Sequence, residues 1–302
     1  MQTGRVSRIA MNITNIIIIK KNNMSSRRNF IQQSVLGIAG TAVLPLLGSA
    51  HATTGADKES SLQIGMAGYT FAKFDVEKTI AMMKRVNVSN LSLKEFHLPL
   101  DSSAEKIQTV MAQFKDGGIN VYAVGVIYMK TKEAVDQAFE YAKKVGVSLI
   151  VGVPNPELID YAEEKVKSSN IRLAIHNHGP EDKLYPSPKN VYDQIKNRDE
   201  RVGLCIDIGH STRAGQDPAK AVLEYSKRVF DLHIKDVSAA VREGKAIELG
   251  RGVIDFPALV KALEKIKYKG FCSLEFEKDM TDPLPGIAES AGYFRGVVRT
   301  VG

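Results

Sequence analysis

The chain has 302 residues, a formal net charge of +7 and two cysteines. Six of its 41 basic residues lie in residues 1–52, which contain no Asp or Glu, and the remaining 35 face 34 acidic residues. The net charge beyond residue 52 is therefore close to +1, so the basic pI does not indicate a nucleic-acid-binding protein.

Residues 1–52 are predicted to be a leader that precedes the folded domain. Within them, "SSRRNFI" places Arg27 and Arg28 just before an apolar stretch rich in Gly and Ala, and "SAHA" follows as a small-residue cleavage site. The arrangement resembles a twin-arginine export signal. We therefore expect a periplasmic protein whose mature form begins at Thr53. Residues 1–23 directly precede Met24 and could lie upstream of the true start.

A membrane anchor is the alternative for this leader. A spanning helix needs about 20 mainly apolar residues. Here the apolar stretch is interrupted by Gln32, Gln33 and Ser34 and by Gly and Pro residues. We expect export and no stable membrane insertion after processing.

From residue 62 onward, short apolar runs alternate with longer amphipathic stretches. Several of the amphipathic stretches begin with a capping residue followed by Pro, and Ser102 with Glu105 reads as a capping box, so these stretches are predicted to be helices. The apolar runs predict eight strands, at residues 63–68, 88–94, 119–126, 147–153, 171–178, 202–209, 229–236 and 270–277.

Eight strand-then-helix units without a linker predict an α/β domain, a single (β/α)8 TIM barrel over residues 53–302. A doubly wound open sheet is the alternative, but it would carry a Gly-rich loop after its first strand, and "AGYTFAKF" is not one. The two cysteines, Cys205 and Cys272, fall at opposite phases of their strands, so no disulfide is expected. This suits a twin-arginine passenger, which folds in the reducing cytoplasm.

Polar side chains gather at the ends of the last four predicted strands. In a barrel, alternate residues point inward and the strands' C-terminal ends form the working face. Buried ionisable groups need partners, because each one left unpaired costs several kcal/mol. Two imidazoles and two carboxylates suit one divalent ion such as Mn, Co, Zn or Fe, and a hydrogen-bonded polar plug is the alternative. The predicted ligands are His176, Asp207, His233 and Glu275.

At these residues the sequence resembles the xylose-isomerase-like TIM barrels, which include sugar phosphate isomerases and epimerases and are related to endonuclease IV. The resemblance rests on "CIDIGH", "LHIKD" and "LEFE". It implies that Asp207, His233 and Glu275 hold a metal and that His210 contacts substrate. "GRGVIDF" looks like the family's loop before the last helix. The chain departs from the family at His176, where many epimerases have a Glu that forms an acid/base pair with the other Glu.

Further candidates surround this predicted site. Lys94 and His178 are predicted, with Glu275, to transfer protons, although Lys94 could equally be a solvated surface residue. His97 and Lys235 are predicted to contact substrate. Glu277 is predicted to do so as well, or to be only a rim charge paired with Lys235.

These features predict an exported, metal-dependent enzyme that enolises an unphosphorylated carbohydrate next to a carbonyl. Isomerisation or epimerisation is the family's default, and β-elimination from a 3-keto-glycoside is the alternative within the same chemistry. A carbohydrate-binding barrel without turnover is a further hypothesis, but the chain has no Trp, the residue on which sugars usually stack. Nuclease activity conflicts with the near-neutral charge and the single predicted metal set. We expect a small carbohydrate partner and no nucleic acid, and the sequence leaves homo-oligomer formation open.

Overall fold

A computed structural model of the chain describes residues 62–301. The predicted leader, its Arg27-Arg28 pair and the cleavage site before Thr53 lie outside the described residues. The first part of the predicted domain, residues 53–61, also lies outside them.

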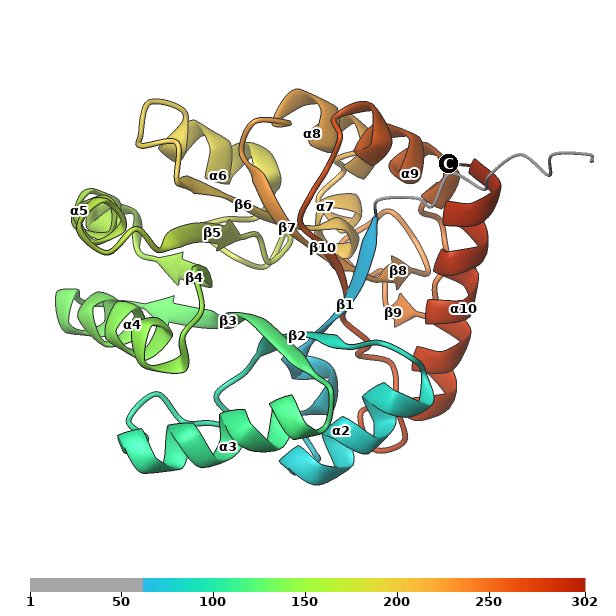
Figure 1. Cartoon of the computed structure of the whole chain (residues 1–302). Helices are drawn as coiled ribbons and strands as arrows, with labels where there is room; N and C mark the ends of the chain where they lie inside the picture. The colour runs from blue at the N-terminus through green and yellow to red at the C-terminus, as the bar shows by residue number, and fades with distance from the viewer. Residues whose placement is uncertain (1–61, 302) are drawn as a thin grey trace, which may run out of the picture. The chain divides into compact units, whose positions relative to one another are not determined.

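Eight parallel strands of the described chain close into a barrel, in the order β1-β10-β7-β6-β5-β4-β3-β2 (Figure 1). Two more strands, β8 and β9, form a separate antiparallel hairpin. The strands are β1 (Gln63–Ala67), β2 (Asn90–Leu93), β3 (Asn120–Met129), β4 (Leu149–Pro154), β5 (Arg172–His176), β6 (Val202–Asp207), β7 (Val229–Ile234), β8 (Asp236–Val237), β9 (Ala246–Ile247) and β10 (Phe271–Leu274).

Helices surround the barrel and follow its strands. They are the 3-10 helices η1 (Gly68–Phe71) and η2 (Pro156–Leu158) and the α-helices α2 (Val76–Arg85), α3 (Ala104–Asp116), α4 (Lys132–Val145), α5 (Ile159–Ser169), α6 (Pro188–Ile195), α7 (Ile208–Arg213), α8 (Pro218–Glu224), α9 (Phe256–Lys265) and α10 (Leu284–Val301). None of the helices within residues 62–301 is long and apolar enough to span a membrane.

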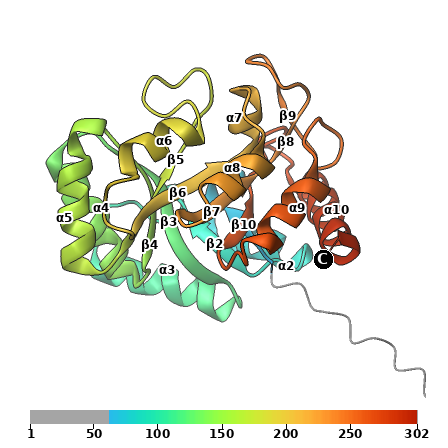
Figure 2. The same cartoon turned by 90° about the horizontal axis from the view of Figure 1, so that it is seen from above.

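The predicted (β/α)8 barrel is confirmed, with all eight predicted strands in place. Two of its strands, β4 and β6, are buried on both faces and have no exposed residue. This explains their nearly continuous apolar sequences, because helices cover the outside while side chains fill the inside. Figure 2 shows α7 and the β8–β9 hairpin on one side of the barrel, and both follow the carboxyl ends of strands.

Two sequence predictions about helices are corrected by the structure. The N-cap of α3 is Ser103, whose side chain accepts a hydrogen bond from the Lys106 amide. The predicted cap at Ser102 is therefore off by one residue, and the capping box with Glu105 does not form, because the third helical residue is Lys106. The "GRGVIDF" loop precedes α9, and α10 follows as the last helix. The conformation of this loop is fixed by Asp236. The Asp236 carboxylate accepts hydrogen bonds from four amides, those of Val237, Gly250, Gly252 and Ile254.

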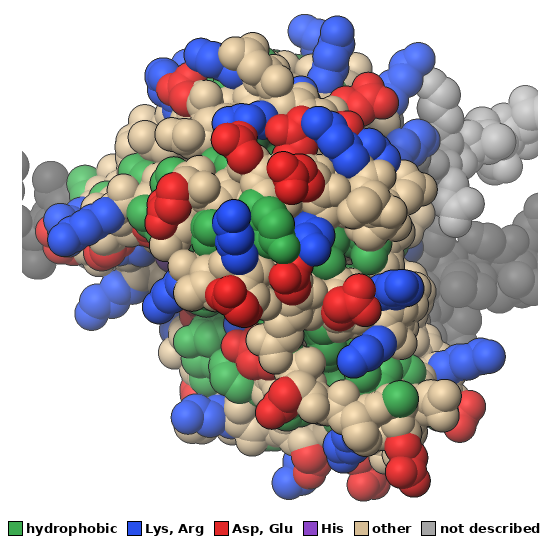
Figure 3. Space-filling view, turned by 90° about the vertical axis from the view of Figure 1, so that its left-hand side faces the viewer, with side chains coloured by type: hydrophobic (Ala, Val, Ile, Leu, Met, Phe, Trp, Pro, Cys, Tyr) green, Lys and Arg blue, Asp and Glu red, His purple; other side chains and the backbone are tan. Residues whose placement is uncertain are grey.

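The outer surface mixes charges of both signs. On the face presented in Figure 3, which includes the side of α4 and α5 in Figure 1, basic and acidic side chains are interspersed. This face offers no continuous basic surface of the kind that nucleic acids select. Both cysteines are buried and free, as expected.

Candidate metal centre and active site

Four of the predicted residues meet inside the barrel near the carboxyl ends of β5, β6, β7 and β10. We call His176, Asp207, His233 and Glu275 the polar quartet. One ligand atom from each lies within 4.8 Å of the others, and all four residues are buried.

The spacing of the polar quartet would allow all four side chains to bind one metal ion. Nε2 of His176 lies 3.1 Å from Nδ1 of His233 and 3.5 Å from Oδ2 of Asp207. Nδ1 of His233 lies 3.3 Å from Oε2 of Glu275. Ligands held at about 2.0–2.2 Å from a metal are separated from one another by about 3.0–3.5 Å. Oδ2 of Asp207 is buried and has no hydrogen-bond partner within the described residues, although two cationic or neutral nitrogens, those of Lys235 and His176, lie near it.

Asp207 is positioned by two elements and one neighbour. It ends β6 and caps α7, where Oδ1 accepts a hydrogen bond from the His210 amide at 2.8 Å. The Asn177 side chain accepts from the Asp207 amide at 3.0 Å and donates to its carbonyl at 3.2 Å. One carboxylate oxygen is therefore committed to the helix, and the other turns toward the polar quartet. Sequence reasoning missed Asn177, although its place between two candidate histidines was a signal.

Lys235 provides the positive charge beside the polar quartet. Its ammonium lies 3.0 Å from Asp207 Oδ2 and 2.7 Å from Oε2 of Glu275, with Glu277 also at 2.7 Å. Burial alone would lower the pKa of Lys235, but the charges of Asp207 and Glu275 hold it well above its usual value. Burial alone would raise the pKa of Glu275, but Lys235 and His233 hold it below its usual value. Glu277 pairs with Lys235, as one sequence reading proposed.

Two further histidines lie at the mouth of the site. The His210 ring is 6.3 Å from that of His176, and burial lowers its pKa to about 4. The His178 ring is 4.5 Å from the His176 ring and partly exposed. Burial lowers the pKa of His178. Both imidazoles therefore lie next to the polar quartet.

His178 sits between two residues that sequence reasoning missed. Its Nε2 lies 3.0 Å from the Tyr128 hydroxyl, and its Nδ1 lies 3.3 Å from Oδ2 of Asp182. The Tyr128 ring stacks on the imidazole at 5.4 Å. Burial, then the charges of Asp182 and Glu275, raise the pKa of Tyr128. The Tyr128 hydroxyl thus contacts one ring nitrogen of His178, and the Asp182 carboxylate lies near the other.

Lys94 and His97 form their hydrogen bonds with residues outside the polar quartet. The Lys94 side chain is buried, which contradicts the solvated surface reading, and it donates to the Val126 carbonyl at 2.6 Å and to Glu95. The His97 ring faces Thr79 of α2, with Nε2 3.2 Å from the hydroxyl. The predicted substrate contact of His97 gains no support from this placement. Its position just after a strand end did not fix the direction of its ring.

The barrel interior beneath the polar quartet is closed by a second polar group. The Tyr122 hydroxyl donates to Asp231 at 2.9 Å and lies 2.5 Å from the Ser273 hydroxyl. Burial raises the pKa of Asp231 to about 7. Asp231 and Ser273 precede His233 and Glu275 by two residues each, so this group forms a polar floor one layer deeper in the barrel.

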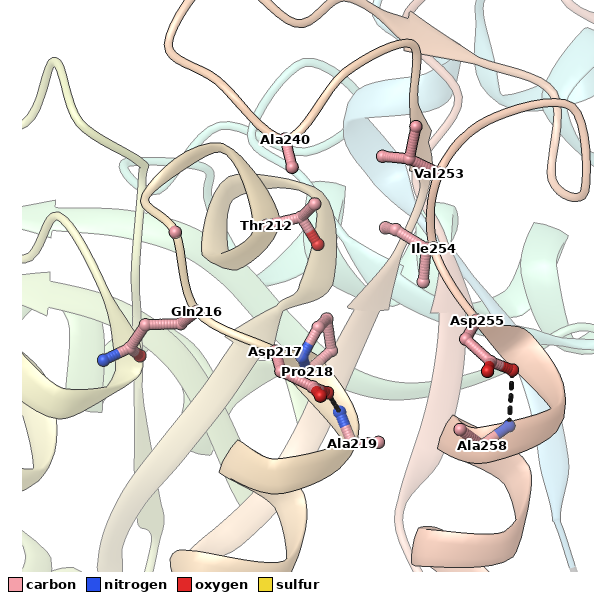
Figure 4. A pocket seen from close by; sticks show the side chains of 11 residues that line it. Thr212, Gln216, Asp217, Pro218, Ala219, Ala240, Val253, Ile254, Asp255 and Ala258 are labelled. Atoms are coloured by element: carbon pink, nitrogen blue, oxygen red, sulfur yellow. Dashed lines mark hydrogen bonds between the residues drawn. The ribbon is translucent and has the colours of Figure 1, made fainter.

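A separate cavity of about 330 Å³ lies beside α7, α8 and the start of α9 (Figure 4). It is lined by small and apolar side chains together with the capping residues Asp217 and Asp255. None of the polar quartet lines it. The chemistry therefore belongs to the barrel mouth and not to this cavity.

Comparison with known families and curated proteins gives a consistent result. The family model described as "Xylose isomerase-like TIM barrel" matches residues 75–297. The chain is 31% identical over 152 residues to the rhizopine catabolism protein MocC of Rhizobium meliloti, covering 45% of this chain and 46% of that protein. It is 33% identical over 161 residues to the inosose dehydratase of Histophilus somni (strain 129Pt), covering 47% and 52%. The chain thus spans about half the length of these relatives, and the dehydratases are named as enzymes.

Solved structures share the fold. An uncharacterised protein from Parabacteroides distasonis aligns with a TM-score of 0.61 at 26% identity, covering 78% of this chain and 98% of that one. An L-ribulose 3-epimerase aligns with a TM-score of 0.64 at 16% identity, covering 80% and 95%. The 3-keto-D-glucoside 4-epimerase YcjR of E. coli aligns with a TM-score of 0.62 at 15% identity, covering 78% and 99%. The likeness to the two epimerases is one of fold alone.

Proposed function

Because the chain belongs to the xylose isomerase-like TIM barrel family, we propose that it is a metal-dependent enzyme acting on an unphosphorylated carbohydrate or cyclitol ketone. The proposed reaction is enolisation next to the carbonyl, followed by loss of the substituent on the β-carbon. One observation carries the choice of elimination: Glu275 is the only glutamate in the polar quartet, with His176 in place of a second. The inosose dehydratase name of several relatives supports this chemistry.

A divalent ion held by the polar quartet would polarise the carbonyl and hydroxyl oxygens of the substrate. Lys235 lies beside both carboxylates of the polar quartet, so its ammonium can stabilise negative charge on an oxygen bound there. The neutral His210 imidazole, on the first turn of α7, can hydrogen-bond a substrate hydroxyl.

Elimination requires a base for the α-proton and an acid for the leaving oxygen, on two different atoms. Two dissimilar groups are available. One is the Glu275 carboxylate. The other is the Tyr128 hydroxyl, which lies within hydrogen-bonding distance of Nε2 of His178 and can exchange a proton with it. A pair of glutamates, which could move one proton across a single carbon, is absent from the polar quartet.

The test is to incubate the metal-loaded protein in D2O with ketoses, keto-cyclitols and 3-keto-glycosides and to follow the products by NMR. We expect an unsaturated ketone and release of water or an alcohol. Deuterium incorporation into a free ketose, with no elimination product from any substrate, would instead establish an epimerase or isomerase. Metal binding without exchange or elimination would favour a carbohydrate-binding barrel.

We also propose that the protein works in the periplasm. Support comes from Arg27 and Arg28, the apolar stretch after them and the Ala50-x-Ala52 site. This location agrees with an unphosphorylated substrate.

A further inference from the structure

We propose that Cys205 is an alternative metal ligand, which replaces the carboxylates of the polar quartet when a thiophilic ion such as Zn²⁺, Co²⁺ or Cd²⁺ binds. The inference rests on the proposed metal-dependent function and adds to it a second, sulfur-containing position for the ion. The two positions share the imidazoles of His176 and His233.

The geometry that carries this inference is a second ligand set. One ligand atom each of His176, Cys205 and His233 lie within 4.8 Å of one another, and all three residues are buried. Cys205 pairs directly with His176 in the β5–β6 register and precedes Asp207 by two residues on β6. Its side chain therefore shares the inward phase of Asp207 but lies one layer deeper in the barrel.

The two sets cannot be filled at once, because each uses both imidazoles. Moving from one to the other exchanges the Asp207 and Glu275 oxygens for one sulfur. Thiolates favour soft ions, whereas carboxylates favour hard ions such as Mn²⁺ and Mg²⁺. A soft ion is therefore expected to bind deeper in the barrel, at Cys205, and a hard ion to bind nearer the strand ends, at the carboxylates.

The sulfur position is less suited to turnover. An ion drawn toward Cys205 moves away from Glu275 and from the open mouth, toward the floor that Tyr122 and Asp231 close. On binding, the Cys205 thiol gives up its proton to solvent. Thiophilic ions are thus expected to bind tightly and to compete with the ion that serves catalysis.

The experiment uses Co²⁺ added in one equivalent to the metal-free full chain under anaerobic conditions. The wild-type protein should show visible d–d bands and an intense near-ultraviolet sulfur-to-cobalt charge-transfer band. Cys205→Ser should keep the d–d bands and lose the charge-transfer band. The matched control is Cys272→Ser, because Cys272 is the other buried cysteine and belongs to neither ligand set within residues 62–301. This control should keep both features.

Competition titrations give a second readout. In Cys205→Ser the affinity for Cd²⁺ should fall about 10-fold or more relative to the affinity for Mn²⁺, on the scale typical of altered metal sites. If Cys205→Ser does not fold, X-ray absorption of the Zn²⁺-loaded Cys272→Ser protein decides the question, because a sulfur neighbour at about 2.3 Å then comes from Cys205.

The outcomes separate this inference from the proposed function. Visible d–d bands without a sulfur band in the wild-type protein would overturn the role of Cys205 and leave the polar quartet as the metal site. A sulfur band that persists in Cys205→Ser would overturn it as well. Failure of the wild-type protein to bind Co²⁺, Mn²⁺ or Zn²⁺ would overturn both proposals.

Discussion

Lys235 carries a positive charge into the part of the barrel where two buried carboxylates face each other. Without its ammonium, Asp207 and Glu275 would be close together with little compensation from solvent. An uncompensated buried charge is strongly destabilising, whereas a bound divalent ion would neutralise the same carboxylates. Lys235 and a bound ion would therefore balance the same negative charge.

We predict that Lys235→Met destabilises the metal-free protein by about 3–5 kcal/mol, the usual result of breaking a buried pair. The loss should be much smaller with metal bound. Thermal unfolding with a chelator and with one equivalent of metal measures the difference. Lys278→Met is the control, since Lys278 pairs with Glu248 but is itself 44% exposed, and it should cost at most about 1 kcal/mol in both states. Equal losses for Lys235→Met in both states would contradict this account.

His176 is the residue at which the chain departs from the epimerase pattern. We predict that His176→Glu keeps metal bound, because carboxylate oxygens bind the same ions at similar distances of about 2.0–2.2 Å. Turnover of a keto-glycoside or keto-cyclitol should nevertheless fall, because the added charge weakens polarisation of the carbonyl. Metal content and NMR-monitored turnover are the measurements. Faster epimerisation of a free ketose by this variant would refute the elimination mechanism.

Helix α7 is joined to the site through its N-cap residue, Asp207. Asp207 caps the helix with Oδ1 and faces His176 and Lys235 with Oδ2. The same carboxylate thus caps the short helix and faces the other polar side chains of the site. Substitutions at this position can separate the two roles.

We predict that Asp207→Asn and Asp207→Ala both lose metal affinity by about 10-fold or more, because each removes the charged ligand. The Asn variant can still cap α7. The Ala variant cannot, so its free energy of unfolding should be lower than that of the Asn variant by about 1 kcal/mol. Metal titration and chemical unfolding of the two variants test this. Full metal occupancy of the Asn protein after chelation and reloading would show that Asp207 is not a ligand.

The strands were the most predictable elements, because their inward residues repeat with a period of two. That period placed His176, Asp207, His233 and Glu275 on one side of four strands, and the barrel topology brought them together. Loops and residues beyond the strand ends have no regular period, so their side-chain contacts could not be predicted from the sequence. The contacts of His178 with Tyr128 and Asp182 depend on how the segment after β5 folds back, and the ring of His97 turned toward α2.

At the scale of the whole molecule, the barrel follows from eight alternating units and agrees with the family match over residues 75–297. Substrate identity does not follow from this topology, because the same barrel carries many chemistries at its mouth. The elimination chemistry therefore rests on the site residues. The predicted periplasmic location of the protein depends on its leader, which lies outside the described residues.

We predict that changing Arg27 and Arg28 together to Lys retains the protein in the cytoplasm, because the export receptor recognises the arginine pair. The unchanged protein should yield a processed form beginning at Thr53 outside the inner membrane. Cell fractionation and N-terminal sequencing of both proteins measure this. Unchanged export of the Lys-Lys form would indicate the general secretory route, and an absence of export in both would refute the leader.

The central claim is that the polar quartet holds one divalent ion, and anomalous X-ray diffraction from crystals of the Mn²⁺-loaded protein tests it most directly. We predict one anomalous peak at about 2.0–2.2 Å from a nitrogen of His176, a nitrogen of His233 and an oxygen of each carboxylate, with the Lys235 ammonium displaced from Asp207. A fully loaded protein whose anomalous peak lies elsewhere, or crystals without a peak in which Lys235 still pairs with both carboxylates, would contradict the claim.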